Sequence, residues 1–238
     1  MTIYELKVFI KLKIPVTFFE NPEFLSKNIN RSFLEDDELR ELHIQDGIKP
    51  YSIDFLRHDG YRKDSFKAED EVYFLVRCVS FEIISRMRTC LEISNRLDFE
   101  VLGSKISTLK PKFIKSLYTM SPAVVTVSID NKAFCWTKED SDISELKRSL
   151  EVNLKSKFAL YGGEFNLKES DEVIDLIEIK NHKPFIFTYK DGQIFAYRYQ
   201  IYFAENRYAQ NLAKIALALG VGEKGSLAFG FARVGRES

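Results

Sequence analysis

The order of hydrophobic patterns in the first half of the chain limits its fold more than any other feature of the sequence. Residues 3–15 alternate apolar and charged side chains over much of their length, which is typical of a half-buried strand. A helix is expected from Asn21-Pro22, because asparagine followed by proline is a common helix start. The remaining patterns predict strand, strand, helix and strand at residues 48–57, 71–79, 80–95 and 97–109. This order, β-α-β-β-α-β, is that of a split ferredoxin-like domain.

Two helices are expected between the first two of these strands. The first has one apolar face, made by residues that recur every fourth position: Leu25, Ile29 and Phe33. Asp36-Asp37 can cap a second, short helix that runs to about His43 and ends before Gly47. His43 is therefore expected at a helix C-terminus beside a glycine turn, and loop edges of this kind often carry chemistry.

The second half of the chain repeats this order less cleanly. A strand is expected at 116–129 and a helix at 141–159. Three strands, a helix and a strand then follow near 172–180, 184–190, 193–204, 206–219 and 226–234. The second and third of these strands are joined by Lys190-Asp191-Gly192-Gln193, in which Asp-Gly is a strong hairpin signal.

The two halves together predict an α+β protein made of two tandem ferredoxin-like (RRM-like, βαββαβ) domains. The N-terminal domain is expected at residues 1–112 and the C-terminal domain at residues 113–238. The repeat is one of element order and not of residue identity.

The charge of the chain is balanced overall but unevenly placed. The 35 Lys and Arg residues equal the 35 Asp and Glu residues, so net charge alone does not favour a polyanionic partner. Residues 101–129 nevertheless contain no acid and form a local basic stretch, with Lys105, Lys110, Lys112 and Lys115. Such a stretch fits either a polyanion-binding patch or solvated lysines around a linker.

Several classes of protein are disfavoured by composition. The three cysteines form no CxxC pair, which argues against a disulfide scaffold and against a zinc site, and we expect neither a metal nor a cofactor. The N-terminus shows no secretory leader pattern, and no apolar run approaches the ~18–20 residues that a membrane span needs. We therefore expect a cytoplasmic protein.

A glycine-rich segment lies near the C-terminus. Gly220-Val221-Gly222-Glu223-Lys224-Gly225 satisfies the G-x-G-x-x-G pattern of dinucleotide-binding folds. That motif must follow a strand and open a helix, whereas this segment follows an expected helix and precedes an expected strand. Nucleotide cofactor binding is therefore disfavoured. Two interpretations of the segment remain. It is either a helix end followed by a glycine turn, or a loop whose amide groups bind phosphates.

The longer pattern resembles a known family, the CRISPR-associated repeat-processing endoribonucleases of the RAMP superfamily. The family's C-terminal loop reads roughly G-hydrophobic-G, five residues with a basic position, then G-hydrophobic-G, and residues 220–231 fit it except that Ala228 replaces one glycine. Two further segments are similar to family segments and lie in the same order. They are Leu42-His43 with Gly47-Ile48-Lys49-Pro50-Tyr51-Ser52, and Leu117-Tyr118-Thr119-Met120-Ser121-Pro122-Ala123-Val124-Val125.

The resemblance implies a tandem ferredoxin-like fold and metal-independent cleavage of CRISPR repeat RNA, the precursor transcript, to mature guide RNAs. In that reaction a 2′-hydroxyl attacks the neighbouring phosphate and leaves a 2′,3′-cyclic phosphate and a 5′-hydroxyl. His43 matches the family's catalytic histidine, and histidine suits proton transfer because its ordinary pKa is near 6.5. Lys49 is the expected stabiliser of the phosphate charge.

The resemblance also implies where RNA would bind and shows one departure from the family. The expected RNA-binding residues are the four lysines of the basic stretch and, in the glycine loop, Gly220, Gly222, Lys224, Ser226 and Gly230. Some members use a tyrosine on the first helix, but residues 28–32 contain none. Either Arg31 or Ser32 substitutes, or the site works with two residues. His58 and His182 match no expected role.

Three functions remain open. The first is the endoribonuclease, possible as a homodimer or within a CRISPR effector complex. The second is a non-catalytic RNA-binding subunit of such a complex on the same fold. The third is a protein–protein module with a ferredoxin-like fold, which predicts no affinity for RNA, whereas both RNA functions predict binding that weakens steeply with salt.

Overall fold

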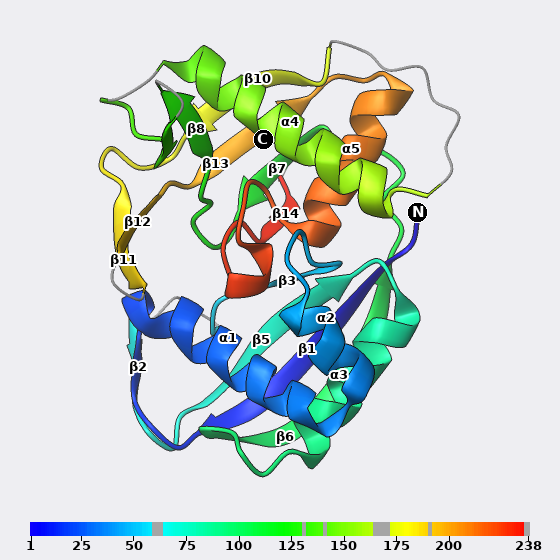
Figure 1. Cartoon of the computed structure of the whole chain (residues 1–238), viewed down its shortest axis with the longest axis vertical. Helices are drawn as coiled ribbons and strands as arrows, with labels where there is room; N and C mark the ends of the chain where they lie inside the picture. The colour runs from blue at the N-terminus through cyan, green and yellow to red at the C-terminus, as the bar shows by residue number, and fades with distance from the viewer. Residues whose placement is uncertain (59–63, 130–131, 140–141, 164–171, 190–191, 236–238) are drawn as a thin grey trace.

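The first half of the chain is built on a four-stranded antiparallel sheet. The structure, a computed structural model, describes residues 1–58, 64–129, 132–139, 142–163, 172–189 and 192–235 (Figure 1). The strands are β1 (Ile3–Leu12), β3 (Tyr51–Ile53), β5 (Glu71–Cys78) and β6 (Phe99–Leu109), and their order across the sheet is β3-β5-β1-β6. With β1 and β5 in the centre, this is the ferredoxin-like arrangement that the sequence predicts.

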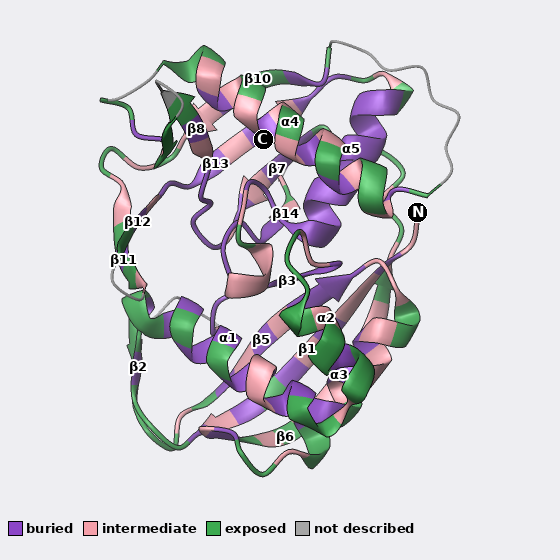
Figure 2. Cartoon of the chain, in the orientation of Figure 1, coloured by how far each residue is buried: buried purple, intermediate pink, exposed green. Residues whose placement is uncertain are grey.

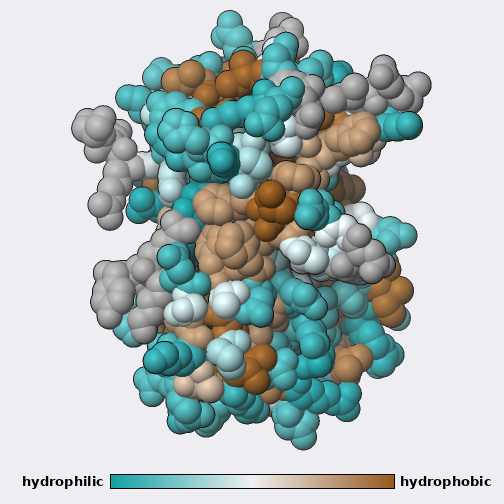
Figure 3. Space-filling view, turned by 90° about the vertical axis from the view of Figure 1, so that its left-hand side faces the viewer, coloured by the Kyte–Doolittle hydropathy of each residue, from teal (hydrophilic) through white to brown (hydrophobic). Residues whose placement is uncertain are grey.

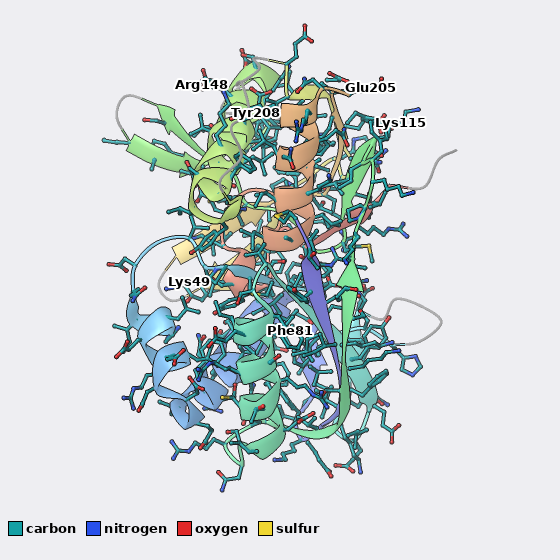
Figure 4. The ribbon with its side chains drawn as sticks, turned by 90° about the vertical axis from the view of Figure 1, so that its right-hand side faces the viewer. Lys49, Phe81, Lys115, Arg148, Glu205 and Tyr208 are labelled. Atoms are coloured by element: carbon teal, nitrogen blue, oxygen red, sulfur yellow. The ribbon has the colours of Figure 1, made fainter. Side chains whose placement is uncertain are left out.

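Helices cover one face of this sheet. They are α1 (Asn21–Ser32), α2 (Asp37–Ile44) and α3 (Phe81–Ile93). Alternate residues of β1 are buried beneath them, as the two-residue period of a strand requires: Leu6, Val8, Ile10 and Leu12 (Figure 2). The residues between them, including Lys7 and Phe9, point to the opposite face. In the described part of the chain no helix covers that face, which lies to the right of the sheet in Figure 4.

The helix starts in the first half follow from capping side chains. The Asp36 carboxylate accepts a hydrogen bond from the Leu39 amide at 3.0 Å, so the predicted cap of α2 is confirmed. Asn21 is the first residue of α1 and not its cap, because a 3₁₀ helix (Phe18–Glu20) runs directly into α1. Two short strands, β2 (Val16–Thr17) and β4 (Ser65–Phe66), pair beside this start.

The second half contains a second four-stranded antiparallel sheet with the same order. Its strands are β7 (Ser116–Thr119), β10 (Ile174–Ile179), β13 (Tyr199–Phe203) and β14 (Ala232–Val234), arranged β10-β13-β7-β14. Two helices, α4 (Ile143–Tyr161) and α5 (Arg207–Leu219), pack against each other in front of it. The tandem ferredoxin-like fold is therefore confirmed. The expected boundary between residues 112 and 113 stays a prediction.

Three expected strands of the second half are wrong in their extent. The strand expected at 116–129 is divided into β7 and β8 (Thr126–Ile129), and β8 forms a hairpin with β9 (Lys132–Cys135). The strand expected at 193–204 is likewise divided into β12 (Gly192–Ala196) and β13, and β12 pairs with β11 (Phe185–Tyr189) outside the main sheet. Residues 225–227 form a 3₁₀ helix, so only the end of the strand expected at 226–234 exists.

These differences have local causes. Pro122, between β7 and β8, has no amide hydrogen for a ladder, so a continuous strand is interrupted there. In the segment expected as a strand at 226–234, the 3₁₀ helix is flanked by Lys224 and Ala228. Both take left-handed backbone conformations that a strand cannot contain. In the predicted hairpin turn, Lys190 and Asp191 lie outside the described residues, while Tyr189 pairs with Gly192 in the β11–β12 register.

Phenylalanine rings join the two halves. Phe187 on β11 contacts the rings of Phe18 and Phe55 from the first half at centroid distances of 5.8 and 6.1 Å. It also contacts Phe229, which follows the 3₁₀ helix of the second half, at 5.1 Å. Figure 3 shows a hydrophobic area on the surface between the upper and lower parts of the molecule. The hydrophobic core of the first half therefore includes side chains from the second.

A buried arginine joins the halves a second time. Arg77 on β5 donates hydrogen bonds to the carbonyl oxygens of Leu217, at 3.1 Å, and of Ala232. Its guanidinium lies 4.2 Å from the centroid of Phe231 and pairs with the Glu5 carboxylate at 2.7 Å. These contacts hold the end of α5 and β14 against the first sheet. Across the described ranges, no helix is both long enough and apolar enough to cross a membrane.

Candidate functional site

His43 lies in the last turn of α2, as the sequence predicts. The side chain is exposed, and its ring meets Phe33 edge-on at a centroid distance of 6.5 Å. The surrounding protein partly shields the imidazole, and this shielding, with the charge of Lys49, lowers its pKa from the ordinary 6.5. The imidazole is therefore mostly neutral at pH 7 and able to accept a proton.

Lys49 follows α2 in the sequence, and its side chain lies against the C-terminal end of that helix. The chain turns at Gly47, whose φ of +113° is in the region that favours glycine, and so brings Lys49 back under α2. Its Nζ donates hydrogen bonds to the carbonyl oxygens of Leu42 at 2.6 Å, His43 at 3.2 Å and Gln45. A lysine at this place satisfies carbonyls that have no partner within the helix and complements the negative end of its dipole.

The contacts of Lys49 bear on its chemistry. An ammonium group has three N–H donors, and here each has a carbonyl acceptor. Burial lowers the pKa of Lys49, while the nearby Asp46 carboxylate acts in the opposite direction. The lysine that was expected to stabilise a phosphate is thus also the cap of the helix that carries His43.

A cavity of about 300 Å³ lies beside Lys49, between the two halves of the chain. From the first half it is lined by the start of β3 and the chain before it, and from the second half by α4, the end of α5 and the glycine loop: Gly47, Ile48, Lys49, Tyr51, Asn153, Lys157, Leu219, Glu223, Lys224, Gly225, Ser226 and Leu227. His43 is not part of this lining. The predicted residues Lys49, Lys224 and Ser226 are therefore brought together by the fold, with His43 on the adjoining helix end.

A residue that the sequence reasoning missed lies at the base of this cavity. Lys157 on α4 is buried, and its Nζ donates hydrogen bonds to the carbonyl oxygens of Gly220 at 2.7 Å and Gly222 at 2.5 Å. Burial lowers the pKa of Lys157 to about 7, with the Glu223 carboxylate acting in the opposite direction. Lys157 holds the start of the glycine loop in place.

The glycines of the loop serve packing within the protein. Gly220, Gly222 and Gly230 are buried and have φ angles of +82°, +68° and +69°. A Cβ atom at Gly222 would overlap the carbonyl oxygen of Val124, and one at Gly230 would overlap that of Val221. Of the predicted loop residues, Lys224 is exposed and Ser226 partly exposed. RNA contact by these residues stays a prediction, and Lys224 and Ser226 are the two with accessible side chains.

The basic stretch lies elsewhere on the molecule. Its four lysines, Lys105, Lys110, Lys112 and Lys115, are all exposed, and none lines the cavity beside Lys49. Figure 4 shows Lys49 on the helix side of the ribbon and Lys115 on the opposite side. A single RNA that touched both would have to pass around the molecule.

Neither residue considered in place of a first-helix tyrosine faces the cavity. Arg31 pairs with the Asp98 carboxylate at 2.9 Å, and Ser32 is fully buried with its hydroxyl donating to the Ile29 carbonyl at 2.7 Å. A tyrosine does reach this region from α4, since the Tyr161 hydroxyl donates to the Ile48 carbonyl. Among the described residues, no group of three or more His, Cys, Asp or Glu side chains is placed to hold a metal ion.

The model of the family described as "CRISPR associated protein Cas6, C-terminal" matches residues 109–234, more than half of the chain. The chain belongs to the Cas6 family. Its matched region holds Lys157, the glycine loop and the whole second sheet. No curated protein sequence matches the chain.

Solved structures share the whole Cas6 fold with this chain at low sequence identity. A CRISPR-associated Cas6 protein is 18% identical with a TM-score of 0.70, covering 98% of this chain and 100% of its own. A Cas6-related protein from Pyrococcus furiosus is 22% identical with a TM-score of 0.68, covering 100% and 99%. A RAMP protein described as binding different RNA substrates is 19% identical with a TM-score of 0.72, covering 99% and 100%.

One sequence signal could have found Lys157. The buried face of α4 repeats as Leu146, Leu150, Leu154 and then Lys157, so a lysine stands where the helical period calls for an apolar side chain. A lysine is almost never fully buried unless its ammonium has partners. Its partners come from a loop 63 and 65 residues away in the Cas6 chain, which the local pattern does not reveal.

Proposed function

We propose that this protein is a metal-independent endoribonuclease that cleaves CRISPR repeat RNA to mature guide RNAs. The observation that carries the proposal is the meeting of His43 and Lys49 at one helix end, with the Lys49 Nζ 3.2 Å from the His43 carbonyl oxygen. This helix end adjoins a cavity that the glycine loop of a Cas6-family domain completes. A solved Cas6 with 16% identity and a TM-score of 0.62 is described as a product complex.

His43 is the proposed proton acceptor. The neutral imidazole takes the proton of the 2′-hydroxyl as that oxygen attacks the adjacent phosphorus. The bond from phosphorus to the 5′-oxygen then breaks, leaving a 2′,3′-cyclic phosphate, and the leaving oxygen takes a proton from solvent. General acid–base help of this kind is typically worth about 10²–10⁴-fold in rate. The lowered pKa of His43 supports this role because it keeps the ring neutral.

Lys49 is the proposed stabiliser of the charged phosphate. Since its ammonium contacts three carbonyls of α2 and the following turn, it would exchange at least one of them for a phosphate oxygen. The exchange is favourable only when a phosphate is present, because a charge-assisted bond to an anion is stronger than one to a neutral carbonyl. A single such donor is typically worth about 10²–10³-fold in rate.

The proposed RNA contacts divide into two groups. Lys224 and Ser226 line the cavity, and we expect them to contact phosphates near the cleaved bond. Lys105, Lys110, Lys112 and Lys115 would bind a part of the transcript more distant from it. Association of the protein with a CRISPR effector complex, or as a homodimer, belongs to the same proposal.

One observation favours the alternative, a non-catalytic RNA-binding subunit on the same fold. All three donors of Lys49 are already occupied, and neither Arg31 nor Ser32 is available near His43 to complete a three-residue site. In the alternative, Lys49 only caps α2 and His43 is an exposed surface residue. The two functions agree on RNA binding and differ on cleavage.

The test is cleavage of the cognate repeat RNA in excess EDTA. We expect one cut, with a 2′,3′-cyclic phosphate at its end, and no cut when the nucleotide before the cleaved bond lacks its 2′-hydroxyl. His43→Ala should lower the rate by about 10²–10⁴-fold and leave the affinity for the uncleavable RNA unchanged. His182→Ala, a change of another exposed histidine, is the matched control and should cleave as the parent protein does.

Two outcomes contradict the proposal. Tight binding of the repeat without any cleavage would support the RNA-binding subunit. Cleavage that disappears with EDTA would indicate metal chemistry, and the role given to His43 would then be wrong.

A further inference from the structure

A second cavity adjoins the one beside Lys49. It has a volume of about 360 Å³ and lies between α4, which contributes Arg148, and the hairpin β8–β9, which contributes Thr126 and Ala133. Figure 4 shows Lys49 and Arg148, which line one cavity each, on the same side of the ribbon. Three residues line both cavities: Ile48, Asn153 and Glu223. These three residues therefore form the boundary at which the two cavities meet.

Asn153, on α4, has an amide oxygen without a partner. Its Oδ1 lies below the surface, and within the part of the chain that the structure describes no group donates a hydrogen bond to it. A buried acceptor of this kind is rare in folded proteins and costs free energy until a donor satisfies it. The side chain as a whole is only partly buried, and the last torsion of asparagine is broad. A small rotation therefore turns the oxygen toward the cavities without breaking a bond to it.

Glu223 adds a carboxylate to the same boundary. Its amide donates to the Val124 carbonyl at 2.8 Å, and its Oε2 accepts a hydrogen bond from the Thr126 hydroxyl at 2.7 Å. These contacts fix the side chain between the glycine loop and the hairpin, because β8 begins at Thr126. A carboxylate offers about four lone-pair positions, so the bond to Thr126 leaves places for further donors.

Ile48 supplies an apolar surface beside these two acceptors. It is partly exposed and directly precedes Lys49, the proposed stabiliser of the phosphate. A flat base can pack on an apolar side chain while its edge reaches polar groups. A phosphate would be repelled by the Glu223 carboxylate and has no hydrogen to donate to Asn153. The boundary between the cavities is therefore suited to a base and not to the RNA backbone.

We propose that Asn153 and Glu223 select guanine at a nucleotide beside the cleaved bond. The inference rests on the proposed function, because the occupant is the transcript that His43 and Lys49 would cut. The edge of an unpaired guanine carries two adjacent donors, N1–H and the 2-amino group, which match the two oxygens of one carboxylate. The second hydrogen of the 2-amino group is then left for Asn153 Oδ1.

The other bases fit the two acceptors less well. Adenine and cytosine carry a ring nitrogen acceptor next to their amino group, and uracil has its N–H between two carbonyl oxygens. Each of them would bring a lone pair against the Glu223 carboxylate, with no donor between the two. Discrimination by one bidentate contact is typically about 5- to 150-fold in affinity.

The test is the binding of short RNAs that cannot be cut. They are fluorescein-labelled 2′-O-methyl pentamers of sequence UUXUU, in which X is guanosine, inosine, adenosine, cytidine or uridine, and they are titrated with the full-length protein at low salt. The guanosine pentamer should bind about 5- to 150-fold more tightly than the adenosine, cytidine and uridine pentamers. Inosine keeps N1–H but lacks the 2-amino group, so its pentamer should bind with intermediate affinity.

Glu223→Gln changes the chemistry of the carboxylate but not its size. The glutamine oxygen can still accept the bond from Thr126, while the amide nitrogen presents donors in place of acceptors. The preference for guanosine over adenosine should therefore fall by about 5- to 150-fold, because an amide pairs well with the edge of adenine. Comparing the two pentamers within one variant cancels the effect of the lost charge on the phosphates.

Asn153→Ala tests the second acceptor. It should weaken binding of the guanosine pentamer by about 2- to 10-fold and leave the inosine pentamer unchanged, because inosine has no 2-amino group. The variant should fold as the parent protein does, since no donor in the described residues loses its partner. Two changes outside both cavities are the matched controls and should keep the parent's order of affinities: Asn30→Ala, a partly buried asparagine on α1, and Glu205→Gln, an exposed acid.

The outcomes separate this inference from the proposed function. Equal affinity for all five pentamers, or a guanosine preference that both variants keep in full, would show that these residues do not select guanine, whatever His43 does. A guanosine preference that disappears in Glu223→Gln, in a protein that never cuts its repeat, would establish the selection of guanine without the nuclease.

Discussion

The ammonium group of Lys157 lies 2.7 Å from the carbonyl oxygen of Gly220, beneath a loop that borders the candidate site. A second bond, to the Gly222 carbonyl, joins the same ammonium to the next turn of the loop. Helix α4 therefore determines where the glycine loop begins, although the two are distant in sequence. A lysine is suited to this because one group supplies several donors to carbonyls that would otherwise be buried without partners.

Replacing Lys157 with methionine should loosen the glycine loop. The change puts in an unbranched side chain one atom shorter and leaves two buried carbonyl oxygens without donors. We expect the free energy of unfolding to fall by about 1–3 kcal/mol, measured by urea denaturation. Lys155→Met, two residues away on the same helix and only partly buried, is the control and should change stability by less than about 0.5 kcal/mol. Equal stability of both variants would show that Lys157 does not hold the loop.

The stability of the folded protein should rise with pH above neutrality. Folded Lys157 releases its proton at about pH 7, whereas in the unfolded chain the pKa is near 10.5, so unfolding takes up a proton between these values. Raising the pH therefore disfavours unfolding, by up to about 1.4 kcal/mol per pH unit. Denaturation of the parent protein between pH 7 and 8.5 measures this slope. The range stops below the ordinary pKa of 9.0 for cysteine, because Cys78 has the opposite effect above it.

The Lys157→Met variant is the control for this pH dependence. In this variant the free energy of unfolding should no longer rise between pH 7 and 8.5 through Lys157. Only the pH dependence of stability that is due to other groups should remain. If the parent protein and the variant show the same slope, the lowered pKa of Lys157 is refuted.

The midpoint of the acid-side decrease in cleavage should lie below the ordinary pKa of histidine. Partial shielding and the Lys49 charge lower the pKa of His43 from 6.5, and a base is active only when neutral. The pH profile of kcat/KM, which reports the free protein, should thus have its acid-side midpoint below pH 6.5. Lys49→Met removes the nearby positive charge, so the decrease should move toward higher pH. A midpoint above pH 6.5 in the parent protein would contradict this environment for His43.

Arg77→Met should strongly destabilise the protein. It removes bonds to the Leu217 and Ala232 carbonyls and leaves the Glu5 carboxylate without its partner in a poorly solvated place. Loss of one member of a buried pair typically costs about 3–5 kcal/mol, measured here by chemical denaturation. Arg88→Met, which breaks an exposed pair with Glu92, should cost less than about 1 kcal/mol. The double variant Arg77→Met with Glu5→Gln should recover part of the loss, and no recovery would contradict the pairing.

The elements that sequence reasoning predicted well are those with long periodic patterns. Helix α5 and strands β1, β5 and β6 were predicted within a few residues, because the apolar residues in their sequences follow the 3.6-residue period in the helix and largely the two-residue period in the strands. The short elements were less predictable. Strand β3 covers only Tyr51–Ile53 of the expected 48–57, and the hairpins β8–β9 and β11–β12 were expected as parts of longer strands, since their limits depend on which partner strand each residue finds.

In the candidate site, too, some features were predictable from the sequence and others depend on tertiary packing. Sequence resemblance pointed to His43 and Lys49, and local capping rules placed His43 at a helix end. The three carbonyl contacts of Lys49 were not predictable, because they depend on how far the chain turns back after Gly47. The loop glycines were expected to face RNA, but tertiary packing places Gly222 against Val124, which is far away in the sequence.

By itself the sequence determined the order of the elements, the tandem fold and the residues at which chemistry is proposed, because these depend on local periodicity and short motifs. Only the tertiary structure decided which of these residues meet. It brought Lys157 under the glycine loop and joined the halves through Phe187 and Arg77. Contacts of this kind depend on the packing of segments more than 50 residues apart, and no local pattern records them.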